Sequence, residues 1–192
     1  MRKFVFFISG LLLLSSCQKN VYFSDFEKLL LDIYNVGDTL IFESDKGEQD
    51  TSFILSKDIG YGSWNPLSRT GEYKLLVGTV YYGSSKNYFQ GKMHPYGLLN
   101  IGKTHPDSSF MFISHNGVSA SWDFETLSST SWESQKVDDK SYIFKASNPA
   151  TRFVIDGQLF FHLDYGITGY VTREGEVWKR VNFKEKRKEN ID

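Results

Sequence analysis

The chain has 192 residues, a net charge of −1 and a single cysteine. Its length is enough for one domain with a sizeable core. One cysteine excludes an intramolecular disulfide, so packing must stabilise the fold. The weakly acidic balance argues against a nucleic-acid partner, because such partners select a basic surface. Sixteen Phe, eleven Tyr and sixteen Gly, against four Pro, favour strands joined by turns.

The chain begins with the three regions of a secretory signal peptide. Arg2 and Lys3 form a basic start, and residues 4–14 form a mostly apolar run that two serines follow. The run is too short for a membrane-spanning helix, which needs about 20 apolar residues. A buried N-terminal strand or helix is the alternative, but the order of the regions favours a translocation signal.

The end of this signal is Leu14-Ser15-Ser16-Cys17. An aliphatic residue three positions before a cysteine, with two small residues between them, resembles the lipobox of bacterial lipoproteins. The resemblance covers only the N-terminal end of the chain. It implies that the Cys17 sulfur receives a diacylglyceryl group, that residues 1–16 are cleaved off, and that the freed amino group is acylated, for example with palmitate.

The resemblance also implies a location and a partner. Gln18 stands where some bacterial lipoproteins carry an aspartate that retains them at the inner membrane. The implied location is therefore the outer membrane of the bacterial cell envelope, with the periplasmic side and the cell surface both open. Two or three acyl chains on Cys17 would hold the protein at the membrane without a spanning segment.

These signals divide the chain into four expected parts. Residues 1–16 are the signal peptide, 17–23 the lipidated cysteine and spacer, 24–183 a single β-rich domain, and 184–192 a charged, frayed tail. Contact of the tail with lipid headgroups is the alternative to fraying.

One segment has a clear helix signal. Ser24 followed three residues later by Glu27 forms a capping box. Apolar residues then recur at helical spacing: Phe26, Leu29, Leu30 and Ile33. Such a short helix needs tertiary packing to persist, so we expect it to cover one end or face of a sheet.

The remainder of the chain has the pattern of short strands. We expect strands at 39–44, 51–56, 73–82, 96–101, 110–114, 118–124, 141–145, 152–155, 158–163, 166–173 and 176–181. Residues 45–50 would close a hairpin, 57–72 would form a loop, and 125–140 a long connection. Gly78 would bend its strand.

Three glycine-containing dipeptides predict tight turns. Asn116-Gly117 is a strong two-residue hairpin signal, and Asp156-Gly157 is a second turn.

The third dipeptide, Glu174-Gly175, would close the last hairpin. If these two residues form the turn, Arg173 faces Glu176 and Val171 faces Trp178, which would place an ion pair and an aromatic–β-branched pair in register.

These strands and turns predict a single, mainly β domain. It would be an antiparallel β-sandwich or a partly open β-barrel with one short N-terminal helix. Strands do not alternate with helices along the chain, which argues against a parallel sheet.

Two common catalytic motifs are absent from the sequence. It contains no G-x-S-x-G and no H-E-x-x-H. Active sites can also assemble across a fold, so the sequence favours a non-enzymatic role without deciding it.

The histidines do not have the spacing of a compact metal site. His94, His105 and His115, together with Asp107, could form one, but their separation matches no common ligand pattern. We therefore expect no metal and no cofactor.

Three tryptophans are candidate ligand-binding residues. Trp64 lies in a Gly-containing loop, and Trp122 and Trp132 flank a Ser/Thr-rich stretch. Aromatic rings beside short polar groups can bind sugars or apolar ligands. Packing in a β core is the alternative, and Trp178 is expected to be structural.

The resulting hypothesis is a lipid-anchored envelope protein that binds a glycan, a lipid or another envelope protein. The alternative is a hydrolase that acts on glycan or peptidoglycan fragments. Such an enzyme needs two carboxylates about 5–5.5 Å or 6.5–9.5 Å apart. The candidates are Asp107, Asp123, Glu125, Asp138 and Asp139.

Overall fold

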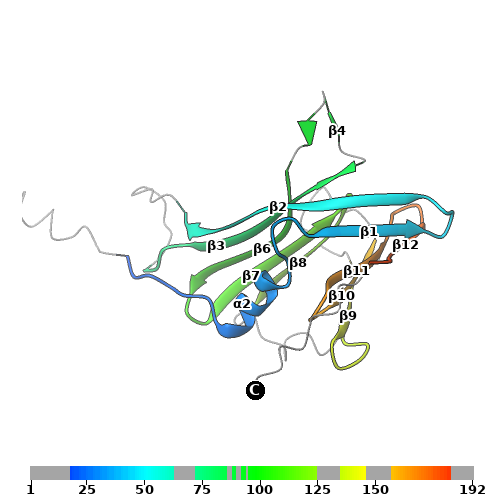
Figure 1. The fold of residues 1–192 in the computed structure, drawn as a ribbon. Helices are drawn as coiled ribbons and strands as arrows, with labels where there is room; N and C mark the ends of the chain where they lie inside the picture. Colours follow the sequence, from blue (N-terminus) through cyan, green and yellow to red (C-terminus); the bar gives the residue numbers. More distant parts are fainter. Residues whose placement is uncertain are drawn as a thin grey trace, which may run out of the picture.

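The computed structural model describes residues 18–62, 72–85, 88–89, 92–93, 95–124, 135–145 and 157–182. In this part of the chain, ten antiparallel strands form one sheet that curls into a nearly closed barrel (Figure 1). The predicted mainly β class with one short N-terminal helix is confirmed. Of the two architectures that the sequence left open, the partly open barrel is the observed one.

The elements of the structure follow one another along the chain in a simple order. They are α2 (Asp25–Asp32), β1 (Thr39–Ser44), β2 (Gln49–Tyr61), β3 (Leu76–Ser84), β4 (Tyr88–Phe89), β5 (Lys92–Met93), β6 (Tyr96–His105), β7 (Ser108–His115), β8 (Val118–Phe124), β9 (Ser141–Lys145), β10 (Gln158–His162), β11 (Gly166–Val171) and β12 (Val177–Arg180). The large sheet has the order β8-β7-β6-β3-β2-β1-β12-β11-β10-β9, and β4 pairs separately with β5.

The barrel closes where the two ends of the sheet approach each other. β8 is one end strand, and it comes close to β10, which is next to the other end strand, β9. A Cβ on Gly157, just before β10, would lie 2.8 Å from Cγ1 of Val118 in β8. A side chain at Gly157 would therefore push this seam apart.

Helix α2 begins at the predicted capping box. The Ser24 amide donates to Glu27 Oε2 at 2.6 Å, and the Glu27 amide donates to Ser24 Oγ at 3.3 Å. The helix packs against β3 and β6 and buries Leu30 and Leu31. The capping box and the expected packing on a sheet are thus confirmed. No helix in the described residues is long and apolar enough to cross a bilayer.

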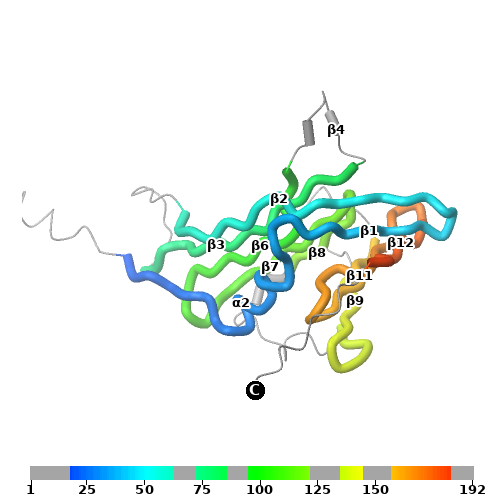
Figure 2. The backbone as a smooth tube through the Cα atoms, viewed as in Figure 1, coloured from blue at the N-terminus to red at the C-terminus, as the bar shows by residue number. Residues whose placement is uncertain are grey.

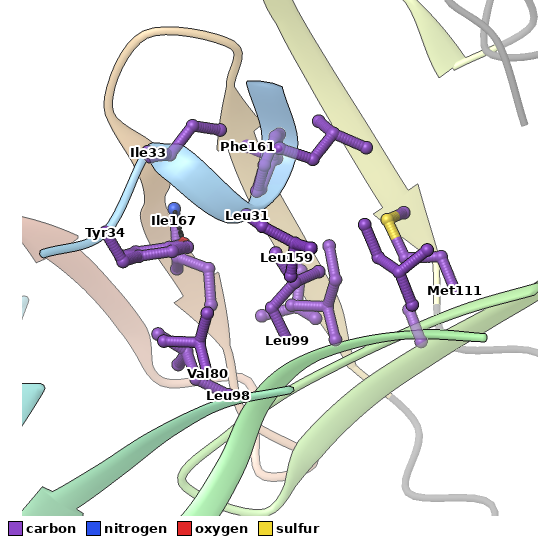
Figure 3. Close-up of a cluster of buried hydrophobic side chains, with 14 of the residues drawn as sticks. Leu31, Ile33, Tyr34, Val80, Leu98, Leu99, Met111, Leu159, Phe161 and Ile167 are labelled. Atoms are coloured by element: carbon purple, nitrogen blue, oxygen red, sulfur yellow. Dashed lines mark hydrogen bonds between the residues drawn. The ribbon is translucent and has the colours of Figure 1, made fainter. Parts of the chain in front are cut away.

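The hydrophobic core lies between the concave face of the sheet and the helix region. Tyr34, which follows the helix, accepts the Ile167 amide on its Oη at 2.8 Å and so joins the helix region to β11. Figure 3 shows side chains from the helix region meeting side chains from both halves of the sheet: Leu31, Ile33 and Tyr34 with Val80, Leu98, Leu99, Met111, Leu159, Phe161 and Ile167.

Gly78 provides room for the helix. A Cβ at this position would lie 2.6 Å from Leu31 Cδ1 and 3.1 Å from Phe23 Cε2. The irregularity of β3 against β6 falls between Val80 and Tyr81 instead. The prediction of a bend at Gly78 therefore put the irregularity a few residues too early, and the glycine serves the close approach of the helix.

Strand β2 is longer than the sequence predicted. The expected loop at 57–72 begins only after Tyr61, because β3 pairs with β2 as far as Tyr61 opposite Leu76. A neighbouring backbone thus holds a polar, Gly-containing stretch in an extended conformation. The same applies to β6, which continues to His105 beside β7. The predicted strand at 152–155 lies outside the described residues.

The two-residue turn Asn116-Gly117 is confirmed. Asn116 has a φ of 48° and Gly117 a φ of 82°. His115 and Val118 are paired directly on either side. The left-handed conformation of both turn residues matches the twist of a two-residue hairpin.

The predicted register of the last hairpin is wrong by one residue. The Thr172 amide donates to the Glu176 carbonyl and the Gly175 amide to the Thr172 carbonyl, so the turn holds three residues. Gly175, with a φ of 84°, takes the left-handed position. Trp178 consequently faces Tyr170, and Val171 faces Val177.

Candidate functional site

Cys17 and two of the three candidate tryptophans, Trp64 and Trp132, lie outside the described part of the chain. Trp122 lies in β8, where its backbone is paired with Met111 of β7. Lipidation of Cys17 and ligand binding by the tryptophans therefore stay predictions.

Two of the candidate metal-binding histidines have different surroundings. His105 ends β6 at an exposed turn, where its Nδ1 accepts the Asp107 amide at 3.2 Å. His115 ends β7 and is fully buried, and His94 lies outside the described residues. Among the residues that the structure describes, no three His, Cys, Asp or Glu side chains come together as metal ligands.

Three of the five candidate carboxylates belong to turns, whereas Asp123 lies in β8 and Glu125 lies outside the described residues. Asp107 lies between β6 and β7, whereas Asp138 and Asp139 precede β9. Asp138 Oδ1 accepts the amides of Lys140 and Ser141 at 2.9 Å each. The Lys140 amide is the main reason why the pKa of Asp138 lies below its usual value. A carboxylate held ionised in this way is a turn cap rather than a general acid.

A cluster of buried polar groups lies on the concave face, where β2, β3 and β7 meet. We call it the His115 cluster; it consists of Asp50, Ser52, Ser84, His115 and Asn116. Ser52 Oγ lies 3.0 Å from His115 Nε2. The Asp50 carboxylate accepts Ser84 Oγ at 2.8 Å and also the Asn116 side-chain amide.

The ring of His115 is enclosed by three aromatic side chains. Its centroid is 4.5 Å from that of Phe42 and 5.0 Å from those of Tyr82 and Tyr170. Burial lowers the pKa of His115 to about 4, although the nearby charge of Asp50 opposes this shift. The imidazole is therefore neutral at pH 7.

The Ser52–His115 pair has the geometry of a nucleophile and a base but not their surroundings. In a catalytic triad a third group orients the base through its other nitrogen. His115 Nδ1 has no hydrogen-bond partner among the described residues. Both side chains are also fully buried. The hydrogen bonds of the cluster join β2 to β3 and to the end of β7.

A buried ion pair joins the helix to the sheet. Lys103 Nζ of β6 lies 3.1 Å from Glu27 Oε1 and 3.0 Å from Oε2. Ser109 of β7 donates its hydroxyl to Glu27 Oε1. Glu27 thus caps its own helix and ties it to two strands.

An open hollow lies beside helix α2, and we call it the α2 opening. Its volume is about 530 Å³. The lining residues come from the N-terminal segment, the helix and the ends of β2 and β3: Tyr22, Phe23, Lys28, Leu31, Asp32, Ile59, Gly60, Tyr61 and Leu76.

A β-bulge turns two apolar residues of β2 toward this opening. The register with β3 shifts between Ile54 and Ser56. As a result Ile59 faces Gly78 and Tyr61 faces Leu76, on the side of the sheet that contacts the helix. The bulge reverses the alternation that would otherwise continue from Ile54.

The N-terminal segment forms the other wall of the α2 opening. Lys19 pairs with Tyr73, just before β3, so the segment runs along this end of the sheet (Figure 2). The Tyr61 hydroxyl donates to the Val21 carbonyl at 2.6 Å. Tyr22 is 73% exposed and Ile59 56% exposed, so apolar surface remains open to solvent.

Two smaller hollows lie on the outer face of the sheet. They have volumes of about 410 and 390 Å³ and share Val177 and Lys179 of β12. The first also extends to Asp138, and the second to Glu43 and Asp45. The exposed lining of the α2 opening is more apolar than that of either smaller hollow.

Comparison with known proteins gives no relative. No protein-family model matches the chain, and searches of the curated proteins and of the solved structures find no match either.

Proposed function

We propose that this chain is a lipid-anchored protein of the bacterial envelope whose β-domain is a binding module and not an enzyme. The α2 opening is the observation that carries the binding role. Its volume of about 530 Å³ lies within the usual range of small-molecule sites. Its lining is mainly apolar, as in most such sites.

The position of the α2 opening fits an anchor at Cys17. Tyr22, which lines the opening, follows Cys17 by five residues. Five extended residues span at most about 18 Å. Acyl chains on Cys17 would therefore hold the opening close to the bilayer surface. Envelope lipids, glycolipids and membrane-associated proteins are the ligands within reach.

The anchor is tested by replacing Cys17 in the full chain. Bacteria that express the protein are fed an alkyne-labelled palmitate, and label and membrane partitioning are measured. Cys17→Ser should abolish both, because the sulfur is the attachment atom. Ser16→Ala keeps a small residue beside the cysteine and should retain both. A Cys17→Ser protein that still carries label would disprove the anchor.

The hydrolase alternative gains no support from the described carboxylates. Asp107, Asp138 and Asp139 occupy turns, and Asp139 pairs with Lys136 at 3.7 Å. The binding role also leaves Trp64, Trp122 and Trp132 as candidate glycan-stacking residues. Loss of glycan binding in their alanine variants would support that assignment.

A further inference from the structure

We infer that the α2 opening binds the alkyl chain of an anionic single-chain amphiphile such as a fatty acid. This inference rests on the proposed binding role and names its ligand class. It depends on the apolar depth of the opening and on the charges at its rim.

The inner wall of the opening is apolar. Phe23, Leu31 and Leu76 are at most 7% exposed and form its depth. Ile59 and Tyr61 stand nearer the mouth, at 56% and 39% exposed. An alkyl chain gains free energy by leaving water for such a wall.

A sugar would be a poorer ligand for this wall. Its hydroxyl groups need hydrogen-bond partners once they leave water. The inner residues are aliphatic or phenyl, and the Tyr61 hydroxyl already donates to the Val21 carbonyl. Lys28 and Asp32 are the charged residues of the lining, and both belong to the rim. The inner wall therefore has no charged or amide group.

The charges at the rim favour an anionic headgroup. Asp32 Oδ1, on the one carboxylate of the lining, lies 2.9 Å from Lys57 Nζ; the Lys57 side chain is 20% exposed and that of Asp32 70%. Lys28 Nζ is 3.3 Å from Asp25 Oδ1, but the Asp25 side chain is fully exposed. Pairs exposed to this degree hold their partners weakly. Lys28 is therefore the cation that a headgroup at the mouth would meet.

Photolabelling of the full-length protein in neutral phosphatidylcholine nanodiscs tests this site. The probes are two palmitic acids that carry a diazirine near the methyl end or near the carboxyl end. The methyl-end probe should label peptides that contain Leu31 and Leu76. The carboxyl-end probe should label the peptide that contains Tyr22 and Lys28. Labelling spread evenly over the surface would overturn the assignment.

Variants at the mouth define the expected specificity. Ile59→Asp should lower labelling of these peptides about tenfold, because a carboxylate replaces apolar wall. Val181→Asp, at another exposed apolar residue, should leave labelling unchanged. Tyr22→Ala removes exposed surface without adding a charge and should lower labelling about threefold. Equal labelling of the wild type and all three variants would contradict the proposal.

The headgroup and the source of the chain are tested separately. Lys28→Glu should lower labelling by the acid about threefold and leave labelling by the corresponding fatty alcohol unchanged. Stronger labelling of the opening in Cys17→Ser than in the wild type would mean that the protein's own acyl chains occupy it. That result would overturn the proposal that a separate amphiphile binds there. Membrane partitioning of Cys17→Ser reports the anchor independently of labelling.

Discussion

At the scale of single residues, burial decides what the ionisable groups of this protein can do. His115 is enclosed by aromatic rings and is neutral at pH 7. Glu27 and Lys103 are also buried, and they form an ion pair with each other. A buried charge without such a partner is strongly destabilising. Each of these residues therefore gives a direct test of the packing around it.

His115 should make the stability of the protein depend on pH. Its pKa is about 4 in the folded protein and about 6.5 in an unfolded chain. Between these values the unfolded chain binds more protons. The free energy of unfolding should therefore be highest above pH 6.5 and fall as the pH drops toward 4. The loss at pH 4.5 should be about 2 kcal/mol.

Urea unfolding at pH 7.5 and pH 4.5 measures this dependence. His115→Gln should be less stable at pH 7.5 and should lose less stability on acidification than the wild type. His105→Gln, on an exposed turn, is the matched control and should keep the wild-type difference. An unchanged pH dependence in His115→Gln would show that other groups cause it.

The Glu27–Lys103 pair should show strong coupling. Lys103→Met leaves the Glu27 carboxylate buried without its cation and should cost about 3–5 kcal/mol. Glu27→Gln strands the ammonium group in the same way. The double variant should be more stable than the sum of both losses predicts, because neither charge remains.

Chemical denaturation of the wild type, the two single variants and the double variant gives the coupling energy between Glu27 and Lys103. The pair Asp25–Lys28 on the same helix is exposed, and Asp25→Asn with Lys28→Met should show little change. Additive losses at Glu27 and Lys103 would mean that the pair is not formed in solution.

At the scale of elements, the last hairpin shows how one turn residue sets a register. Gly175 adopts a φ of 84° in a three-residue turn. A two-residue turn would have placed Val171 opposite Trp178. The observed turn places Tyr170 there, and the two rings stack at 5.8 Å with an interplanar angle of 5°. A shift by one residue would exchange the buried and exposed faces of the strand.

Gly175→Ala should therefore destabilise the protein. A left-handed φ costs a residue with a Cβ about 1–2 kcal/mol. Gly60→Ala is the matched control, because Gly60 lacks a left-handed φ and a Cβ there would meet nothing within 4 Å. The free energies of unfolding from urea titrations compare the two. Equal stability of both variants would argue against the three-residue turn.

At the scale of the whole molecule, the curvature of the sheet creates the core and the opening together. The sheet curls until β8 approaches β10, and helix α2 lies across its concave side against β3 and β6. The helix covers only part of this face. Beyond the bulge, the ends of β2 and β3 extend past the helix and leave the α2 opening.

Local sequence signals predicted the parts of this fold that depend on neighbouring residues. The capping box of Ser24 and Glu27 and the turn at Asn116-Gly117 are both present. Each depends on backbone and side-chain groups within a few residues. The β class followed in the same way from alternation, aromatic content and turns.

The candidate site could not be predicted from the sequence in this way. The polar stretch that contains Ile59 and Tyr61 has the composition of a loop, and only pairing with β3 makes it a strand. No local pattern marks the bulge after Ile54, which turns both side chains toward the helix. The tryptophans and the lone cysteine are rare residues and therefore became the candidates in the sequence, whereas common residues line the opening.

The sequence by itself therefore determined the class of the fold, its helix start and a tight turn, and it predicts an anchor at Cys17. The tertiary structure alone decided the closure of the barrel, the register of the last hairpin and the position of the α2 opening. The physical reason is how far apart in the sequence the interacting residues lie. Caps and turns form between residues that are close in sequence, whereas strand register, bulges and concave surfaces depend on partners that only the folded chain brings together.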